Sequence, residues 1–274
     1  MNRIKKFFAM VLCLVALMTP IDDRPDLRPR RARLRTYARR AFYSYQRIVN
    51  RRWAHLKTET HGMLRPATYK AIYQAAKRMA DLDFVEIGGA HGASSIAIAQ
   101  GMADGGRTGR LVVVEQCRGG SRALYGGYDQ NYATITRNYR RFGVADRISL
   151  YPYKLLDETV PDVLGLLETK SIAGFMHDAD GDLGRDFQHF WPLVIPGGLI
   201  VIDDYPRSEH VTHPKKYRTW FLLNQLMEWG LFAIDERHTD TVIGHKPLVA
   251  PGWDLFDRAV MDQIKDEHAL AVAA

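Results

Sequence analysis

The chain has 274 residues, of which 46% are hydrophobic and 25% are charged, and its formal net charge is +7. This composition excludes a disordered or collagen-like chain and leaves room for one globular domain with an appended segment. The two cysteines, Cys13 and Cys117, are too few for a disulfide scaffold and match no zinc-binding spacing. The fold must therefore rest on an ordinary hydrophobic core.

The positive charge lies at one end of the chain. Residues 1–56 carry 14 Lys and Arg against three Asp, a net charge of +11, which leaves −4 for residues 57–274. The chain therefore divides into an apolar, arginine-rich leader, residues 1–56, and a domain, residues 57–274. Because the basic surplus lies outside the domain, the composition does not indicate a nucleic-acid-binding domain.

The leader begins with a basic segment followed by an apolar run from Phe7 to Met18. This run is shorter than the roughly 20 residues of a membrane-spanning helix, and no small-residue cleavage site follows it. From Arg30 to Trp53, apolar residues recur at helical spacing opposite arginines, which predicts a basic amphipathic helix. Three interpretations stay open: a cleaved secretion signal, peripheral contact with an anionic membrane surface, and a segment that packs on the domain.

Short apolar runs alternate with segments of helical periodicity over most of the domain. A helix is expected near residues 67–80, with Pro66 in its first turn. Strands are then expected at 84–87, 111–114, 148–151, 173–176 and 199–202, and helices near 94–102, 132–142, 160–167, 185–193, 217–229 and 254–269. Apolar strands separated by helices are typical of a parallel sheet covered on both faces. We therefore predict an α/β fold, a doubly wound and mostly parallel sheet preceded by N-terminal helices.

The first predicted strand leads directly into a glycine-rich turn. Residues 86–92 read E-x-G-x-A-x-G, which is neither the dinucleotide-binding G-x-G-x-x-G nor a P-loop. The second predicted strand is followed by Glu115, which is either part of the same site or an ordinary acid at a strand end. Ligands of such sheets bind at the carboxyl ends of the strands, where small residues let the backbone approach a bound cofactor closely.

Acidic residues follow the fourth and fifth predicted strands. Residues 177–180 read His-Asp-Ala-Asp, and residues 203–205 read Asp-Asp-Tyr at the end of the strand that follows a Pro-Gly-Gly turn. Converging carboxylates repel one another unless a cation lies among them, and Mg²⁺ prefers oxygen ligands. The pattern therefore favours a metal site, with helix capping or solvent exposure of the acids as the alternative.

The glycine turn together with Glu115 resembles class I S-adenosylmethionine-dependent methyltransferases. The Pro-Gly-Gly strand that ends in Asp-Asp-Tyr resembles their metal-dependent small-molecule O-methyltransferase group, which contains the catechol and macrolide-sugar enzymes. The resemblance covers roughly residues 83–205 and implies a Rossmann-like methyltransferase fold and transfer of a methyl group from S-adenosylmethionine to a hydroxyl of a small molecule or sugar. It also implies Mg²⁺ at Asp178, Asp203 and Asp204. The cofactor-binding positions that it implies are Glu86, Gly88, Gly89, Ala90, Gly92, Ser94, Glu115 and Asp178.

The chain departs from this group at the base that would remove the hydroxyl proton. Relatives often carry Lys or His three positions after the first metal-binding Asp, where this chain has Gly181. The candidate bases are therefore Asp182, His210 and His213, with His177 as a further candidate. The acceptor pocket is expected to be shaped by residues 58–65, 208–216 and 237–251.

Two other functions stay open from the sequence. The first is an NAD(P)-dependent oxidoreductase, against which the missing dinucleotide motif and the acidic cluster argue. The second is an inactive methyltransferase-like protein that binds a membrane surface, which the arginine-rich leader and Gly181 motivate. We expect a cytoplasmic location, with membrane contact through the leader, because S-adenosylmethionine is a cytosolic metabolite. No nucleic-acid partner is expected, and oligomerisation through the N-terminal helices stays open.

Overall fold

The computed structural model describes residues 50–118, 126–179, 183–207 and 213–249. The chain separates into two compact units, Met1–His55 and Leu56–Ala274. The apolar run, most of the predicted amphipathic helix and the predicted helix at 254–269 lie outside the described residues. The helix α3 (Arg51–Thr60) continues beyond Trp53, where the predicted helix ended.

Among the residues that the structure describes, no helix is long and apolar enough to cross a membrane.

The domain is built on a single sheet, which has seven strands in the described ranges, in the order β3-β2-β1-β4-β5-β7-β6. Strands β1 to β5 are parallel, whereas β7 runs antiparallel to both β5 and β6. The predicted doubly wound, mostly parallel sheet is therefore confirmed. The strands are β1 (Asp83–Ile87), β2 (Leu111–Val114), β3 (Ile148–Tyr151), β4 (Ile172–His177), β5 (Val194–Ile202), β6 (Ala233–His238) and β7 (Thr241–His245).

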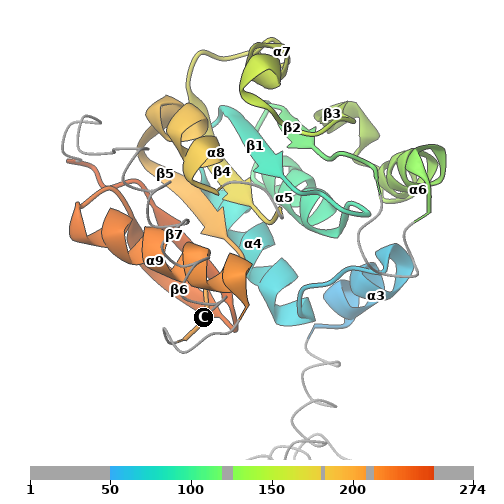
Figure 1. Cartoon of the computed structure of the whole chain (residues 1–274). Helices are drawn as coiled ribbons and strands as arrows, with labels where there is room; N and C mark the ends of the chain where they lie inside the picture. The colour runs from blue at the N-terminus through green and yellow to red at the C-terminus, as the bar shows by residue number, and fades with distance from the viewer. Residues whose placement is uncertain (1–49, 119–125, 180–182, 208–212, 250–274) are drawn as a thin grey trace, which may run out of the picture. The chain divides into compact units, whose positions relative to one another are not determined.

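Helices cover both faces of the sheet (Figure 1). On one face, Val85 and Ile87 of β1 belong to a hydrophobic core that includes residues of α7, α8 and α9. On the other face, Glu86 accepts a hydrogen bond from Ser95 of α5, which packs closely on α4. All five residues of β1 are buried, which explains why its sequence shows no polar alternation. The helices are α4 (Pro66–Arg78), α5 (Ala93–Asp104), α6 (Tyr128–Arg141), α7 (Val160–Leu164), α8 (Leu183–Phe190) and α9 (Pro214–Glu228), with 3₁₀ turns at Ala145–Arg147, Asp157–Thr159 and Trp191–Leu193.

The antiparallel end of the sheet was not expected from the sequence. Strands β6 and β7 form a hairpin that begins before residues 237–251, the region predicted only to shape the acceptor pocket, and β7 lies within that region. Strand β6 reads AIDERH and is half-buried or exposed throughout, so it lacks the apolar run that marks the other strands. Strand β5 also begins earlier than predicted, at Val194.

The strand order reverses between β1 and β4, which leaves a crevice at their carboxyl ends. Backbone hydrogen bonds hold these ends together: Asp178 N–H donates to the Ile87 carbonyl at 2.8 Å, and Asp203 N–H donates to the His177 carbonyl at 3.0 Å. The fold therefore brings the glycine turn after β1 next to the acidic residues after β4 and β5.

Candidate active site

The glycine turn after β1 lies against the backbone that follows β4. Gly88 has a φ of +92°, and a methyl group on its Cα would lie 2.2 Å from the carbonyl oxygen of Asp178. Gly92 has a φ of +90°, and a methyl group there would lie 2.6 Å from the ring of Tyr139. Both positions therefore require glycine, because the conformation and the close contact each exclude a side chain.

Glu115 follows β2 and is held by backbone hydrogen bonds to both carboxylate oxygens. Ala90 N–H donates to Oε2 at 2.6 Å, and Cys117 N–H donates to Oε1 at 3.0 Å. These bonds link the carboxylate to the glycine turn and fix its orientation. Cys117 is buried, and burial together with Glu115 raises the pKa of its thiol to about 12, which keeps the thiol protonated.

Glu86 lies behind the glycine turn rather than in the large cavity described below. Its side chain is fully buried; Oε2 accepts a hydrogen bond from the Ser95 hydroxyl, while Oε1 has no hydrogen-bond partner within the described ranges. Burial raises the pKa of Glu86 to about 7, and the nearby Ser94 and Ser95 hydroxyls offset part of this effect. The carboxyl group is therefore poised between its neutral and ionised forms near neutral pH.

Three carboxylates converge where β4 and β5 end. Asp178, Asp203 and Asp204 each offer one oxygen, and these oxygens lie within 4.8 Å of one another. Burial, followed by the charge of Asp203, raises the pKa of Asp178 well above its usual range. Burial also raises the pKa of Asp203, although the Thr241 hydroxyl donates a hydrogen bond to it. We call these three residues the carboxylate cluster.

Two lysines at the start of α9 meet the carboxylate cluster. The Nζ atom of Lys215 lies 2.6 Å from Oδ2 of Asp204. The Nζ atom of Lys216 lies 2.5 Å from Oδ2 of Asp240 and 3.7 Å from Oδ1 of Asp204. Neither ion pair was predicted, because the sequence marked only a substrate loop at residues 208–216.

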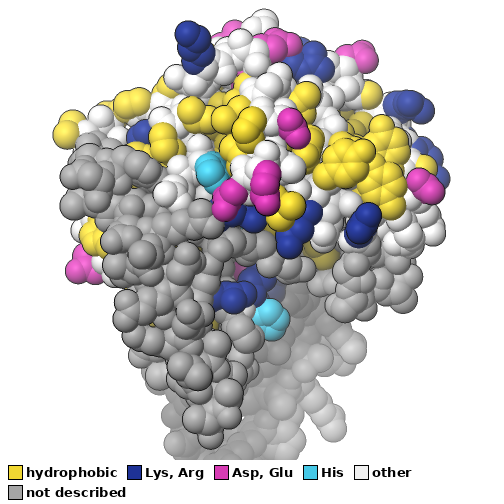
Figure 2. Space-filling view, turned by 45° about the horizontal axis from the view of Figure 1, so that its top comes forward, with side chains coloured by type: hydrophobic (Ala, Val, Ile, Leu, Met, Phe, Trp, Pro, Cys, Tyr) yellow, Lys and Arg dark blue, Asp and Glu magenta, His cyan; other side chains and the backbone are white. Residues whose placement is uncertain are grey.

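A cavity of about 730 Å³ joins these groups. This volume lies within the range of small-molecule sites. Acidic and basic side chains lie side by side, close to apolar patches, on the face seen in Figure 2. The three regions predicted to shape the acceptor pocket contribute Met63–Arg65, His213, Lys215, Lys216 and His238–Thr241 to the lining of the cavity.

The structure distributes the predicted cofactor-binding residues between two hollows. Gly88, Ala90, Glu115 and Asp178 line the large cavity. Gly89 and Ser94 line a small adjacent hollow, which Gly88, Ala90 and Asp178 also border. Glu86 and Gly92 line neither hollow. Glu86 instead contacts Ser95, and Gly92 lies against the ring of Tyr139.

The four candidate bases differ in placement. His213 lines the large cavity and is exposed, whereas Asp182 and His210 lie outside the described residues. His177 is buried and does not line the cavity; its Nε2 atom lies 3.0 Å from Oδ2 of Asp186.

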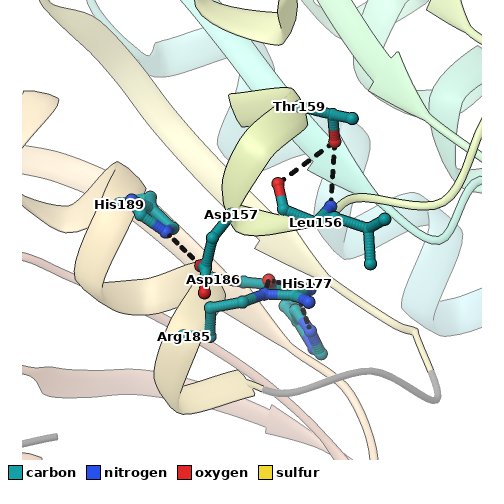
Figure 3. Close-up of polar contacts among 7 residues, drawn as sticks. All are labelled: Leu156, Asp157, Thr159, His177, Arg185, Asp186 and His189. Carbon is teal, nitrogen blue, oxygen red and sulfur yellow. Dashed lines mark hydrogen bonds and ion pairs between the residues drawn. The ribbon is translucent and has the colours of Figure 1, made fainter. Parts of the chain in front are cut away.

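Figure 3 shows how His177 is held. The guanidinium of Arg185 donates to Oδ1 of Asp186, so both oxygens of this buried carboxylate are engaged. On the same helix, His189 lies 2.8 Å from Asp157, which ties α8 to the turn before α7. The His177–Asp186 contact therefore joins the carboxyl end of β4 to α8, and sequence pattern does not predict it because the two residues belong to separate elements.

Comparison with known proteins identifies the domain. Residues 85–205 match the protein family described as a methyltransferase domain. No protein of curated function matches the chain in sequence.

Several solved structures share the fold. The chain is similar to cofactor-bound Rv0187 from MTB, with 18% identity and a TM-score of 0.54 over 70% of this chain and 88% of that chain. It is also similar to the O-methyltransferase TomG from Streptomyces achromogenes, which is involved in tomaymycin synthesis and was solved with S-adenosylmethionine (18% identity, TM-score 0.52, 72% and 89% coverage). A third similar structure is the O-methyltransferase from Bacillus cereus in complex with S-adenosylhomocysteine (17% identity, TM-score 0.51, 74% and 90% coverage).

The family match and the fold together confirm the predicted class. Residues 85–205 form a methyltransferase domain with the class I fold. The predicted methyltransferase is therefore confirmed for this domain, whose fold is shared with the O-methyltransferases named above.

Proposed function

We propose that this methyltransferase transfers the methyl group of S-adenosylmethionine to a hydroxyl of a small molecule or sugar, with Mg²⁺ held by Asp178, Asp203 and Asp204. The observation that carries the proposal is that the oriented carboxylate of Glu115 and the carboxylate cluster line one cavity. The names of TomG and the Bacillus cereus protein, both O-methyltransferases, support the same chemistry.

On the donor side, the chain would bind S-adenosylmethionine through its glycine turn and Glu115. Gly88 would let the ligand approach the backbone closely, because this residue has no side chain and lines the cavity. Glu115 would accept hydrogen bonds from the ribose hydroxyls, and its two backbone hydrogen bonds already fix its orientation. Little binding energy would then be lost in ordering this side chain.

On the acceptor side, the carboxylate cluster fits a hard divalent cation. It offers three oxygen ligands, and the raised pKa of Asp178 reflects repulsion and burial that a cation would relieve. When bound, Mg²⁺ would lower the pKa of the acceptor hydroxyl and orient its oxygen. The cluster would hold this ion through Asp178, Asp203 and Asp204.

The transfer is an in-line displacement at an activated sulfonium, so the protein must mainly align the donor and acceptor and remove one proton. His213 borders the cavity and is exposed, which supports it as a candidate base. Asp182 and His210 stay predicted alternatives. We likewise predict that the acceptor is a hydroxyl of a small molecule or sugar and that the protein is cytoplasmic. Membrane contact through residues 1–56 and oligomerisation are further predictions.

Isothermal titration calorimetry with S-adenosylhomocysteine tests the donor site. We expect the intact protein to bind this product and the Glu115→Ala variant to bind it roughly 10- to 100-fold more weakly, because hydrogen bonds to a charged group are lost. Glu158→Ala, at an exposed position, is the matched control and should keep the affinity of the unchanged protein. Thermal unfolding of each variant checks that the fold is kept. Absence of binding by the intact protein would refute the proposed function.

A further inference from the structure

The ammonium group of Lys215 already occupies the acidic end of the cavity. It contacts Oδ2 of Asp204 at 2.6 Å, and the side chains of both residues are mostly buried, with exposed fractions of 17% and 22%. The ion pair is therefore partly shielded from solvent, which strengthens it relative to a surface pair. Lys215 also lines the cavity, so its head group lies where ligands would bind.

Lys216 provides a natural comparison at the next position of α9. It forms its short contact with Asp240, at 2.5 Å, and lies 3.7 Å from Asp204. The two lysines carry the same charge in the same turn of the helix. Lys215 alone of this pair makes the short contact with an oxygen of the carboxylate cluster.

We propose that Lys215 is the resident counter-cation of the carboxylate cluster, and that a divalent ion binds Asp204 only by displacing the Lys215 ammonium. This inference rests on the metal site of the proposed function. Asp178, Asp203 and Asp204 bring three carboxyl groups together, and the same Asp204 carboxylate that would coordinate the ion is held by Lys215. The ion and the ammonium therefore compete for one partner.

Mn²⁺ binding, followed by the electron paramagnetic resonance signal of the free ion, tests this competition without relying on activity. We expect Lys215→Met to bind Mn²⁺ at least about tenfold more tightly, because the competing charge in contact with Asp204 is removed. Lys216→Met removes the same charge one position away and should tighten binding by less than about threefold. Lys215→Arg keeps the charge and should keep the affinity of the unchanged protein. Equal effects of Lys215→Met and Lys216→Met, or no effect of Lys215→Met, would overturn the inference.

Thermal unfolding provides a second readout. In the presence of a chelator, Lys215→Met should lower the unfolding temperature, because the cluster loses its counter-charge. Excess Mg²⁺ should shrink or reverse this difference, because the ion then stabilises the variant more than the unchanged protein. An unfolding difference that Mg²⁺ leaves unchanged would contradict displacement.

The same samples separate this inference from the proposed function. If no variant binds Mn²⁺ while S-adenosylhomocysteine still binds, then the metal site and this inference are both refuted and the donor site stands. If Mn²⁺ binds with equal affinity to all variants, only the inference is refuted.

Discussion

At the residue scale, Gly88 is a position of the glycine turn that tolerates little change. Its φ of +92° is unfavourable for any other residue, and an added methyl group would meet the backbone at Asp178 rather than a movable side chain. The strain of a substitution would therefore pass directly to the carboxyl end of β4. Gly106 also has a positive φ, +71°, but a methyl group there would meet nothing within 4 Å.

Gly88→Ala should therefore lower the free energy of unfolding by about 3 kcal/mol or more, since conformational strain and steric overlap add. It should also abolish measurable binding of S-adenosylhomocysteine. Gly106→Ala isolates the conformational cost and should lose only about 1 kcal/mol with unchanged binding. Urea denaturation and calorimetry measure both effects, and equal losses in the two variants would show that the contact with Asp178 carries no cost.

Glu86 makes stability depend on pH. Burial raises its pKa from 4.5 to about 7, so the folded protein holds this proton more tightly than the unfolded chain does. The stabilisation from proton binding is present at low pH and is lost as the pH rises from near 4.5 through about 7.

Glu86→Gln removes this ionisation while keeping the shape of the side chain. Relative to the unchanged protein, the variant should gain free energy of unfolding as the pH rises, by up to about 3 kcal/mol between pH 4.5 and 8. Urea denaturation at several pH values, without ligand, measures the difference. A difference that stays constant over this range would mean that Glu86 does not titrate there.

At the scale of elements, the start of β1 depends on one buried carboxylate. Asp83 accepts hydrogen bonds from three backbone N–H groups: Arg110 at 2.8 Å, Glu168 at 2.5 Å and Thr169 at 3.0 Å. It therefore joins the beginnings of β1 and β2 to the segment that leads into β4. This end of the sheet lies opposite the carboxyl ends where the cavity is formed.

Asp83→Ala should lower the free energy of unfolding by about 2–4 kcal/mol, because the three N–H groups lose a charged acceptor. The affinity of the folded protein for S-adenosylhomocysteine should stay unchanged. Asp81 is the matched control: it accepts from the backbone N–H groups of Thr108 and Gly109 but is exposed, so water can replace it in Asp81→Ala at a cost below about 1 kcal/mol. Equal destabilisation of the two variants in urea denaturation would contradict the role assigned to burial.

At the scale of the whole molecule, the sequence predicts what depends on local pattern. Strands β1, β2 and β4 are recognisable because burial on both faces requires apolar runs, and the glycine turn and the acids are recognisable because they directly follow such runs. Strand β6 escapes prediction because it is charged and partly exposed. The Lys215–Asp204 pair escapes it too, since that contact exists only once α9 has packed beside the end of β5.

The close approach of Gly88 to Asp178 has a consequence for how enzymes of this kind can diversify. Backbone meets backbone at this point, so the separation between the glycine turn and the backbone at Asp178 is set by main-chain geometry. Substituting side chains elsewhere in the cavity would leave that separation intact. Residues 63–65 and 238–241 line the same cavity from separate segments. Under the proposed function, selection could therefore remodel those segments for new acceptors while the distance over which the methyl group travels is inherited unchanged.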